Sequence, residues 1–159
     1  MHYLDASALV KLIVAEEFSD EMHSWVQTDR VLVTSDLTRT ELMRAVTRVH
    51  AGWAQRVRAV LDSVETVGLT RRVLDEAGRL APATLRSLDA IHLATALSFG
   101  DDLESIVTYD DRLAEAAQHA GLVVTAPGAT NVSSGFSDIK RTEAPGSTAE
   151  IIEDLRNPW

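Results

Sequence analysis

The spacing of apolar residues along the chain switches repeatedly between two patterns. Short apolar runs that end in polar residues predict five strands, at residues 2–5, 31–34, 66–70, 105–108 and 122–125. Apolar residues spaced three or four positions apart predict helices at residues 6–14, 18–27, 36–49, 53–64, 71–80, 86–97 and 112–119. Because strands alternate with helices, we expect a three-layer α/β/α domain with helices on both faces of a mostly parallel central sheet.

The pattern changes after Gly128, where linker-like polar stretches begin. Ser147 and Glu150 have capping-box spacing, and the apolar residues that follow them predict a short amphipathic helix. We therefore expect a compact domain at residues 1–128 and a C-terminal extension at residues 129–159.

Composition limits the class of protein. A chain of 159 residues, 45% of them hydrophobic, is long enough for one globular domain with an appendage. The absence of cysteine excludes disulfides, thiolate zinc sites and a cysteine nucleophile, and leaves carboxylates and imidazoles as metal ligands. No apolar run approaches the length of a membrane span, and the chain opens on a predicted core strand rather than a basic signal peptide. We therefore expect a cytoplasmic protein that does not act at a membrane.

The charge is unevenly distributed. Fifteen basic and 24 acidic residues give a net charge of −9, which argues against nucleic-acid binding through general positive charge. Between Arg39 and Arg86, however, nine basic residues accompany five acidic ones. The middle of the chain is therefore locally basic.

Acidic residues lie where predicted strands end. Asp5 follows the first strand and Asp110 follows the fourth. Because the C-terminal ends of parallel strands gather at one edge of a sheet, we expect both side chains in one crevice. Asp89, near the start of an otherwise apolar helix, and Glu41, in the third predicted helix, can reach this crevice from its flanks. Ser7 either caps the first helix or holds Asp5 by a hydrogen bond.

Several carboxylates in one pocket repel one another unless a cation neutralises them. Mg²⁺ and Mn²⁺ suit ligand sets made only of oxygen. Such an ion polarises a phosphoryl group and lowers the pKa of a bound water, which then attacks. The four carboxylates therefore indicate metal-dependent hydrolysis of a phosphodiester, the chemistry of a nuclease.

Four sequence blocks, in a fixed order, carry a resemblance to a known family. The blocks are Tyr3 to Leu12, Thr40 to Leu42 with Arg44, Leu88 to Ala94, and Val107 to Asp110. They resemble the signature of PIN-domain ribonucleases, specifically toxins of the VapC type, and the match spans about residues 1–128. The first block reads Asp-Ala-Ser where family members often have Asp-Thr-Ser. The resemblance implies a PIN-like fold, an Mg²⁺- or Mn²⁺-dependent endoribonuclease, a homodimer, and neutralisation by a cognate antitoxin.

The resemblance also assigns roles by position. The family's catalytic and metal-binding acidic residues fall on Asp5, Glu41, Asp89 and Asp110. Ser7 falls on the hydroxyl position that supports the first aspartate, and Asp111 is a further supporting candidate.

The expected substrate is RNA, with tRNA and rRNA the first candidates. Arg44 and Arg48 either contact RNA phosphates beside the site or form a solvated helix face. The extension at residues 129–159 either behaves like the C-terminal segment of an antitoxin, with a short helix in a groove, or is disordered.

Two other functions compete with a ribonuclease. A catalytically silent PIN-like module would use the same crevice only to bind an antitoxin or RNA. A phosphotransfer domain is a weak alternative, because it needs a lysine near the strand ends and the only lysines are Lys11 and Lys140. We interpret His92 as a packed core histidine, and Tyr109 as a core or dimer residue rather than a base-stacking one.

Overall fold

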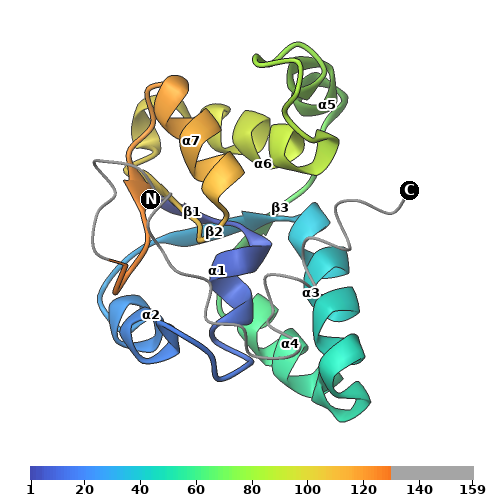
Figure 1. Cartoon of the computed structure of the whole chain (residues 1–159), viewed down its shortest axis with the longest axis vertical. Coiled ribbons are helices and arrows are strands. Elements are labelled where there is room, and N and C mark those ends of the chain that lie inside the picture. The colour runs from blue at the N-terminus through green and yellow to red at the C-terminus, as the bar shows by residue number, and fades with distance from the viewer. Residues whose placement is uncertain (130–159) are drawn as a thin grey trace.

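The computed structural model describes residues 1–129, which form a parallel sheet with helices on both faces (Figure 1). The five strands are β1 (His2–Leu4), β2 (Leu32–Ser35), β3 (Glu65–Val67), β4 (Ser105–Val107) and β5 (Val124–Thr125). The helices are α1 (Ala6–Val10), α2 (Ser19–Val26), α3 (Asp36–Val49), α4 (Ala54–Asp62), α5 (Arg71–Ala77), α6 (Ser87–Leu97) and α7 (Asp111–His119), with short 3-10 helices η1 (Ala51–Trp53) and η2 (Gly100–Asp102). The predicted three-layer α/β/α architecture is confirmed.

Every strand and helix predicted within residues 1–128 is present, but several are shorter than expected. The N–H groups of Leu12 and Ile13 donate to carbonyls three residues earlier, and these tight turns end α1 at Val10. α6 begins at Ser87 rather than at Arg86, which occupies the extended N-cap position. Apart from Ala129, the predicted C-terminal extension lies outside the described residues. Within residues 1–129, no helix has both the length and the apolar character that crossing a membrane requires.

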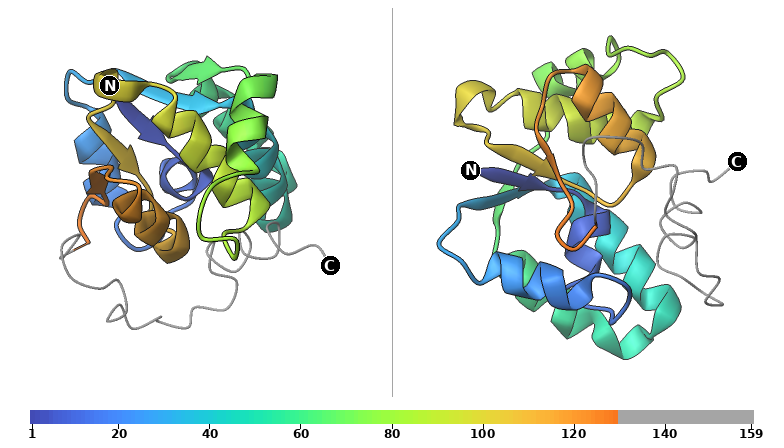
Figure 2. Two further views of the ribbon diagram at one scale, coloured as in Figure 1. Left: turned by 90° about the horizontal axis from the view of Figure 1, so that it is seen from above. Right: turned by 60° about the vertical axis from the view of Figure 1, so that its left-hand side comes forward.

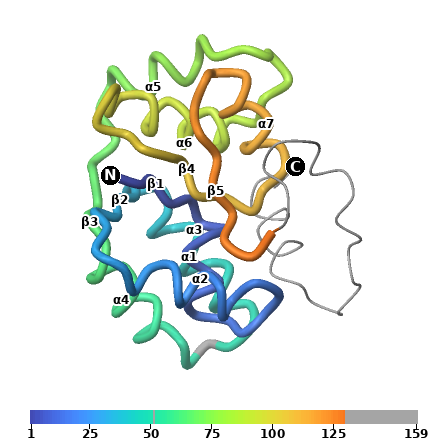
Figure 3. The backbone as a smooth tube through the Cα atoms, turned by 90° about the vertical axis from the view of Figure 1, so that its left-hand side faces the viewer, coloured from blue at the N-terminus to red at the C-terminus, as the bar shows by residue number. Residues whose placement is uncertain are grey.

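The strand order, β3-β2-β1-β4-β5, places β1 at the centre of the sheet (Figure 3). Tyr3 of β1 lies opposite Val33 of β2 on one side and Ile106 of β4 on the other, in parallel register. The chain builds outward from β1 in one direction through β2 and β3, and in the other through β4 and β5. The C-terminal ends of β1 and β4 therefore form the topological switch point, where open α/β sheets bind ligands.

Alternate residues of the central strands pack into opposite layers of the domain. Leu4 and Val107 pack in the cluster that includes residues of α1, α2, α3 and α4, whereas Tyr3 and Ile106 pack against α6 and α7. The views in Figure 2 show these two groups of helices on opposite faces of the sheet. Because β1 and β4 are covered on both faces, the residues that follow them are anchored to a rigid core.

Candidate active site

Asp5 is the residue at which β1 passes into α1, and its side chain is fully buried. Its Oδ1 atom accepts hydrogen bonds from the N–H of Ala8, at 3.0 Å, and from the hydroxyl of Ser7, at 2.6 Å. Its Oδ2 atom accepts a hydrogen bond from the Thr108 hydroxyl, at 2.8 Å. Asp5 is thus itself the N-cap of α1, and these bonds fix the orientation of its carboxylate.

Ser7 holds Asp5 in place, which is one of the two roles that the sequence left open. Besides donating to Asp5, its Oγ atom accepts a hydrogen bond from the N–H of Tyr109, at 2.8 Å. The buried Ser7 side chain therefore joins the first turn of α1 to the end of β4.

Asp110 follows β4 and caps α7, as Asp5 caps α1. Its Oδ1 atom accepts hydrogen bonds from the N–H groups of Arg112, at 3.0 Å, and Leu113, at 2.9 Å. Its own N–H donates to the Thr108 hydroxyl oxygen, at 3.0 Å. Since the same hydroxyl donates to Asp5, Thr108 bridges the two aspartates. Asp111, the first residue of α7, is exposed.

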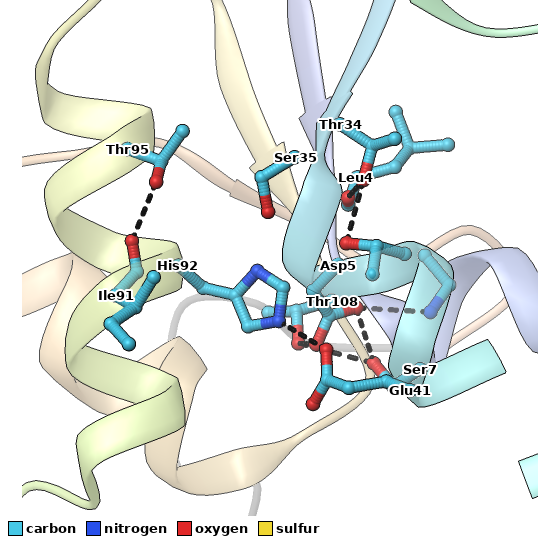
Figure 4. Close-up of polar contacts among 12 residues, drawn as sticks. Leu4, Asp5, Ser7, Thr34, Ser35, Glu41, Ile91, His92, Thr95 and Thr108 are labelled. Atoms are coloured by element: carbon cyan, nitrogen blue, oxygen red, sulfur yellow. Dashed lines mark hydrogen bonds and ion pairs between the residues drawn. The ribbon is translucent and has the colours of Figure 1, made fainter. Parts of the chain in front are cut away.

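Glu41 lies in the second turn of α3, is 3% exposed, and contacts α6. Its Oε2 atom is 2.7 Å from Nε2 of His92. Figure 4 shows the two side chains pointing toward each other. A carboxylate accepts hydrogen bonds, so His92 Nε2 is the donor in this contact. His92 is fully buried, as the interpretation of a packed core histidine requires, but it also binds a candidate site residue.

A buried chain of hydrogen bonds continues from His92 into the sheet. Nδ1 of His92 lies 2.7 Å from the hydroxyl of Tyr3, which is in turn 3.1 Å from the Ser35 hydroxyl. Burial, followed by the nearby charges of Asp5 and Glu41, raises the pKa of Tyr3 well above its ordinary value, against the opposing effect of the Ser35 hydrogen bond. The phenol therefore keeps its proton within this chain at neutral pH.

Asp89 lies in the first turn of α6 and is fully buried. It precedes His92 by three residues, so both side chains lie on the same side of α6, the side that faces Glu41. Asp89 and His92 therefore share one side of α6.

Arg44 and Arg48 are exposed on α3, one and two turns beyond Glu41. Their position agrees with either a phosphate-binding role or a solvated helix face.

Lys11, just after α1, is a buried residue that the sequence did not single out as part of the site. Its Nζ atom donates to Oε1 of Glu16 and to the carbonyl of Glu17, both at 2.9 Å. It also lies 4.4 Å from the ring centroid of Tyr109, a cation–π contact. Tyr109 stacks on Phe18 with ring centroids 6.0 Å apart, so the structure shows packing, as we interpreted for this tyrosine.

The chemistry of these donors fits a hard divalent cation. Asp5, Glu41 and Asp89 are buried carboxylates, and burying such charges is unfavourable unless hydrogen bonds or a cation compensate. Among residues 1–129, however, no three metal-binding side chains lie close enough together to hold an ion by themselves. Mg²⁺ suits such an arrangement, because it usually keeps several waters and binds only one or two carboxylates directly.

Known proteins resemble this chain in sequence. The model of the PIN domain family matches residues 2–118. Ribonuclease VapC46 of Mycobacterium tuberculosis is 45% identical over 125 residues, which cover 79% of this chain and 96% of that protein. Ribonuclease VapC47 of Mycobacterium tuberculosis is 42% identical over 134 residues, which cover 81% of this chain and 98% of that protein.

Two solved structures share the fold. Mycobacterium tuberculosis VapC20, described as a sarcin-ricin loop cleaving toxin, has a TM-score of 0.64 at 17% identity, and the match covers 80% of this chain and all of that one. A toxin–antitoxin complex from Klebsiella pneumoniae has a TM-score of 0.56 at 21% identity, covering 69% of this chain and 87% of that one. Together with the family model and the relatives, this likeness confirms the predicted resemblance. The chain belongs to the PIN domain family and, within it, to the VapC ribonucleases, the toxins of toxin–antitoxin systems.

Proposed function

We propose that this VapC ribonuclease is an Mg²⁺- or Mn²⁺-dependent endoribonuclease that acts in the cytoplasm. The observation that carries the proposal is the Thr108 bridge, which joins Asp5 to Asp110 where the two central strands end. Glu41 in the second turn of α3 and Asp89 in the first turn of α6 are buried carboxylates on two flanking helices. We assign the metal to these four carboxylates, with Ser7 and Asp111 in supporting positions.

The protein's own residues would act by orientation. When bound, the divalent ion polarises the phosphoryl group and lowers the pKa of a water that attacks it. Ser7 and Thr108 fix both oxygens of Asp5, and His92 fixes one oxygen of Glu41. Asp110 keeps the direction imposed by its capping bonds to α7. Carboxylates held in this way need little rearrangement when the ion and the substrate bind.

We propose a structured RNA, tRNA or rRNA, as the substrate. VapC20, which shares the fold, is described as cleaving the sarcin-ricin loop, and single-stranded loops are the RNA elements that proteins most often read by sequence. We assign Arg44 and Arg48, both exposed on α3, to phosphate contacts beside the site.

A cognate antitoxin and a second copy of the chain are the proposed protein partners. The Klebsiella pneumoniae structure with the same fold is a toxin–antitoxin complex. We also propose that residues 129–159 act like an antitoxin's C-terminal segment and inhibit the site. Cleavage by a chain ending at Gly128 should then exceed cleavage by the full chain, and equal rates would contradict inhibition by the extension.

Cleavage assays test the proposed chemistry. The full chain and Asp5→Asn are incubated with a panel of tRNAs and rRNA fragments, in Mg²⁺ or Mn²⁺ and in EDTA. We expect internal cleavage only with metal, and its loss in Asp5→Asn, because the amide removes a charged ligand from a position that hydrogen bonds already fix. Asp29→Asn, an exposed loop position, is the matched control and should cleave normally.

Cleavage by the metal-bound protein distinguishes the proposed enzyme from the catalytically silent module. If the folded protein binds Mn²⁺ and RNA but cleaves no RNA in the panel, the chain is a binding module rather than a nuclease. If cleavage persists in EDTA or in Asp5→Asn, the assignment of the metal to these carboxylates is wrong.

A further inference from the structure

A cavity of about 770 Å³ lies beside the proposed site, between α6, α7 and the segment that leads into α6. Figures 1 and 2 show α6 and α7 next to each other on one face of the sheet. The cavity volume falls within the roughly 300–1,000 Å³ typical of small-molecule sites. It therefore has the size of a nucleotide rather than of a folded partner.

The lining of the cavity combines an apolar floor with charged side chains. Leu80, Pro82, Leu85, Leu93 and Ala116 supply the apolar surface. Arg86, Arg112 and His119 supply cationic or titratable nitrogen, against one acidic residue, Glu115. Such a concentration of basic groups is unusual in a chain of net charge −9, and it favours an anionic ligand.

Two lining residues of the cavity are close in sequence to proposed site carboxylates. Arg86 occupies the N-cap position of α6, three residues before Asp89, and the N–H of Arg112 donates to Asp110. From Arg112 the lining residues follow α7 to Ala120, about 12 Å at 1.5 Å per residue. The lining of the cavity therefore begins at residues next to two of the proposed site carboxylates.

We infer that this cavity is a binding subsite for an unstacked nucleotide next to the phosphodiester that is cleaved. Arg86 and Arg112 face the RNA backbone, while the base packs on the apolar floor formed by Pro82 and Leu85. Unstacked bases bind to proteins by packing on apolar surfaces and guanidinium planes, and this mode reads single-stranded RNA. The inference rests on the proposed ribonuclease function. It predicts that residues of the loop before α6 determine which RNA base the enzyme prefers at this position.

A pair of neighbouring substitutions tests the subsite. Thr84 lines the cavity and Ala83 does not, although both are exposed in the same loop. Thr84→Trp should fill the opening, and Ala83→Trp is the control with the same added bulk. Binding is measured by fluorescence anisotropy with short single-stranded homopolymers of A, C, G and U, in EDTA so that no RNA is cleaved. We expect Thr84→Trp to weaken the tightest complex about tenfold and Ala83→Trp to leave it within about twofold.

A second pair of variants tests the charge. Arg112→Gln keeps the backbone N–H that donates to the capping residue Asp110 but removes the guanidinium. We expect this change to reduce the slope of the logarithm of the binding constant against the logarithm of the salt concentration by about one. Arg58→Gln, at an exposed position of α4, is the control and should leave this slope unchanged.

Other outcomes would overturn the inference without touching the ribonuclease. If the native chain cleaves RNA and Thr84→Trp binds and cleaves it equally well, the cavity is not a subsite. If Thr84→Trp instead converts a dimer to a monomer in light scattering and leaves RNA binding intact, a second copy of the chain covers the cavity. Conversely, weaker RNA binding by Thr84→Trp in a protein that cleaves nothing would support nucleotide binding in the cavity, but it would reject both the nuclease and the place of the cavity beside a cleaved phosphodiester. Bis(p-nitrophenyl) phosphate is a substrate too small to need the subsite. Its rate of hydrolysis with Mn²⁺ should therefore be equal in the two tryptophan variants.

Discussion

His92 and Glu41 lie on different helices and meet through one buried contact, 2.7 Å between Nε2 and Oε2. The other imidazole nitrogen is 2.7 Å from the Tyr3 hydroxyl, so the ring is held at both ends. Rotation of the ring would break one of these contacts. His92 therefore fixes the direction of Glu41, as hydrogen-bonded neighbours do for metal-binding side chains generally.

Removing the imidazole should weaken metal binding. His92→Leu leaves an apolar side chain of similar size beside Glu41, and we expect the affinity for Mn²⁺ to fall about 10–100-fold in isothermal titration calorimetry. His92→Gln, which can still donate a hydrogen bond, should lose less affinity. His23→Leu, at an exposed position of α2, is the control. Unchanged Mn²⁺ affinity in folded His92→Leu would show that the contact does not position a ligand.

The Thr108 bridge can be removed without changing the shape of the side chain. Thr108→Val loses the donor to Asp5 and the acceptor for the Asp110 N–H. Because these partners stay in place around a buried methyl group, we expect the free energy of unfolding to fall by about 1–3 kcal/mol. Urea denaturation measures this change, and Thr47→Val, on the exposed side of α3, should be nearly neutral. Equal denaturation midpoints for the native chain and Thr108→Val would contradict the bridge.

Lys11 stabilises the segment after α1 through its charge. In the ion pair with Glu16, the two side chains are 9% and 20% exposed, so both charges are largely removed from water. Lys11→Met keeps the aliphatic chain but leaves Glu16 without its cation, and we expect a loss of about 3 kcal/mol in urea denaturation, at the low end for buried pairs. Lys11→Arg preserves the charge and the contact with the Tyr109 ring, so it should recover most of the loss. An equally large loss in both variants would mean that packing, not charge, is responsible.

Both tyrosines of the chain should resist ionisation in the folded state. Burial is the largest effect that raises the pKa of Tyr3 and of Tyr109 above the ordinary value of 10.0. Above about pH 10 the unfolded chain therefore releases phenolic protons that the folded chain keeps, so stability falls as the pH rises further.

Absorbance at the tyrosinate wavelength, recorded with far-UV circular dichroism, checks this expectation. The tyrosinate signal should rise only together with unfolding, and at a lower pH in concentrated guanidinium. A tyrosinate signal that rises while the circular dichroism stays native would contradict the raised pKa values.

Much of the site could be predicted because it follows from local pattern and topology. Asp5 and Asp110 each follow an apolar strand, and parallel pairing of adjacent central strands then brings them together. Their capping of α1 and α7 is also a local effect, since each accepts hydrogen bonds from N–H groups two or three residues ahead. The order of strands and helices along the chain was likewise predicted from the local spacing of apolar residues.

The contacts that depend on tertiary packing could not be predicted. Glu41 and His92 are 51 positions apart, and only the packing of α3 against α6 sets their distance. A histidine in an apolar helix looks like a core residue in sequence, and His92 is one, but the pattern carries no sign of its partner. The burial of Lys11 could not be predicted either, because a single lysine after an apolar helix normally reaches solvent. Thr108 carried a weak signal, since it is the polar end of an otherwise apolar strand.

The distance along the chain between Asp5 and Thr108 also sets how early in synthesis the Thr108 bridge can form. Thr108 lies 103 positions after Asp5. Ribosomes add about 5–20 residues per second, so about 5–20 s of synthesis separate the first half of the bridge from the second. During that interval β1 lacks its β4 neighbour, and Asp5 lacks the hydrogen bond from Thr108. The Thr108 bridge can therefore form only after β4 has been synthesised.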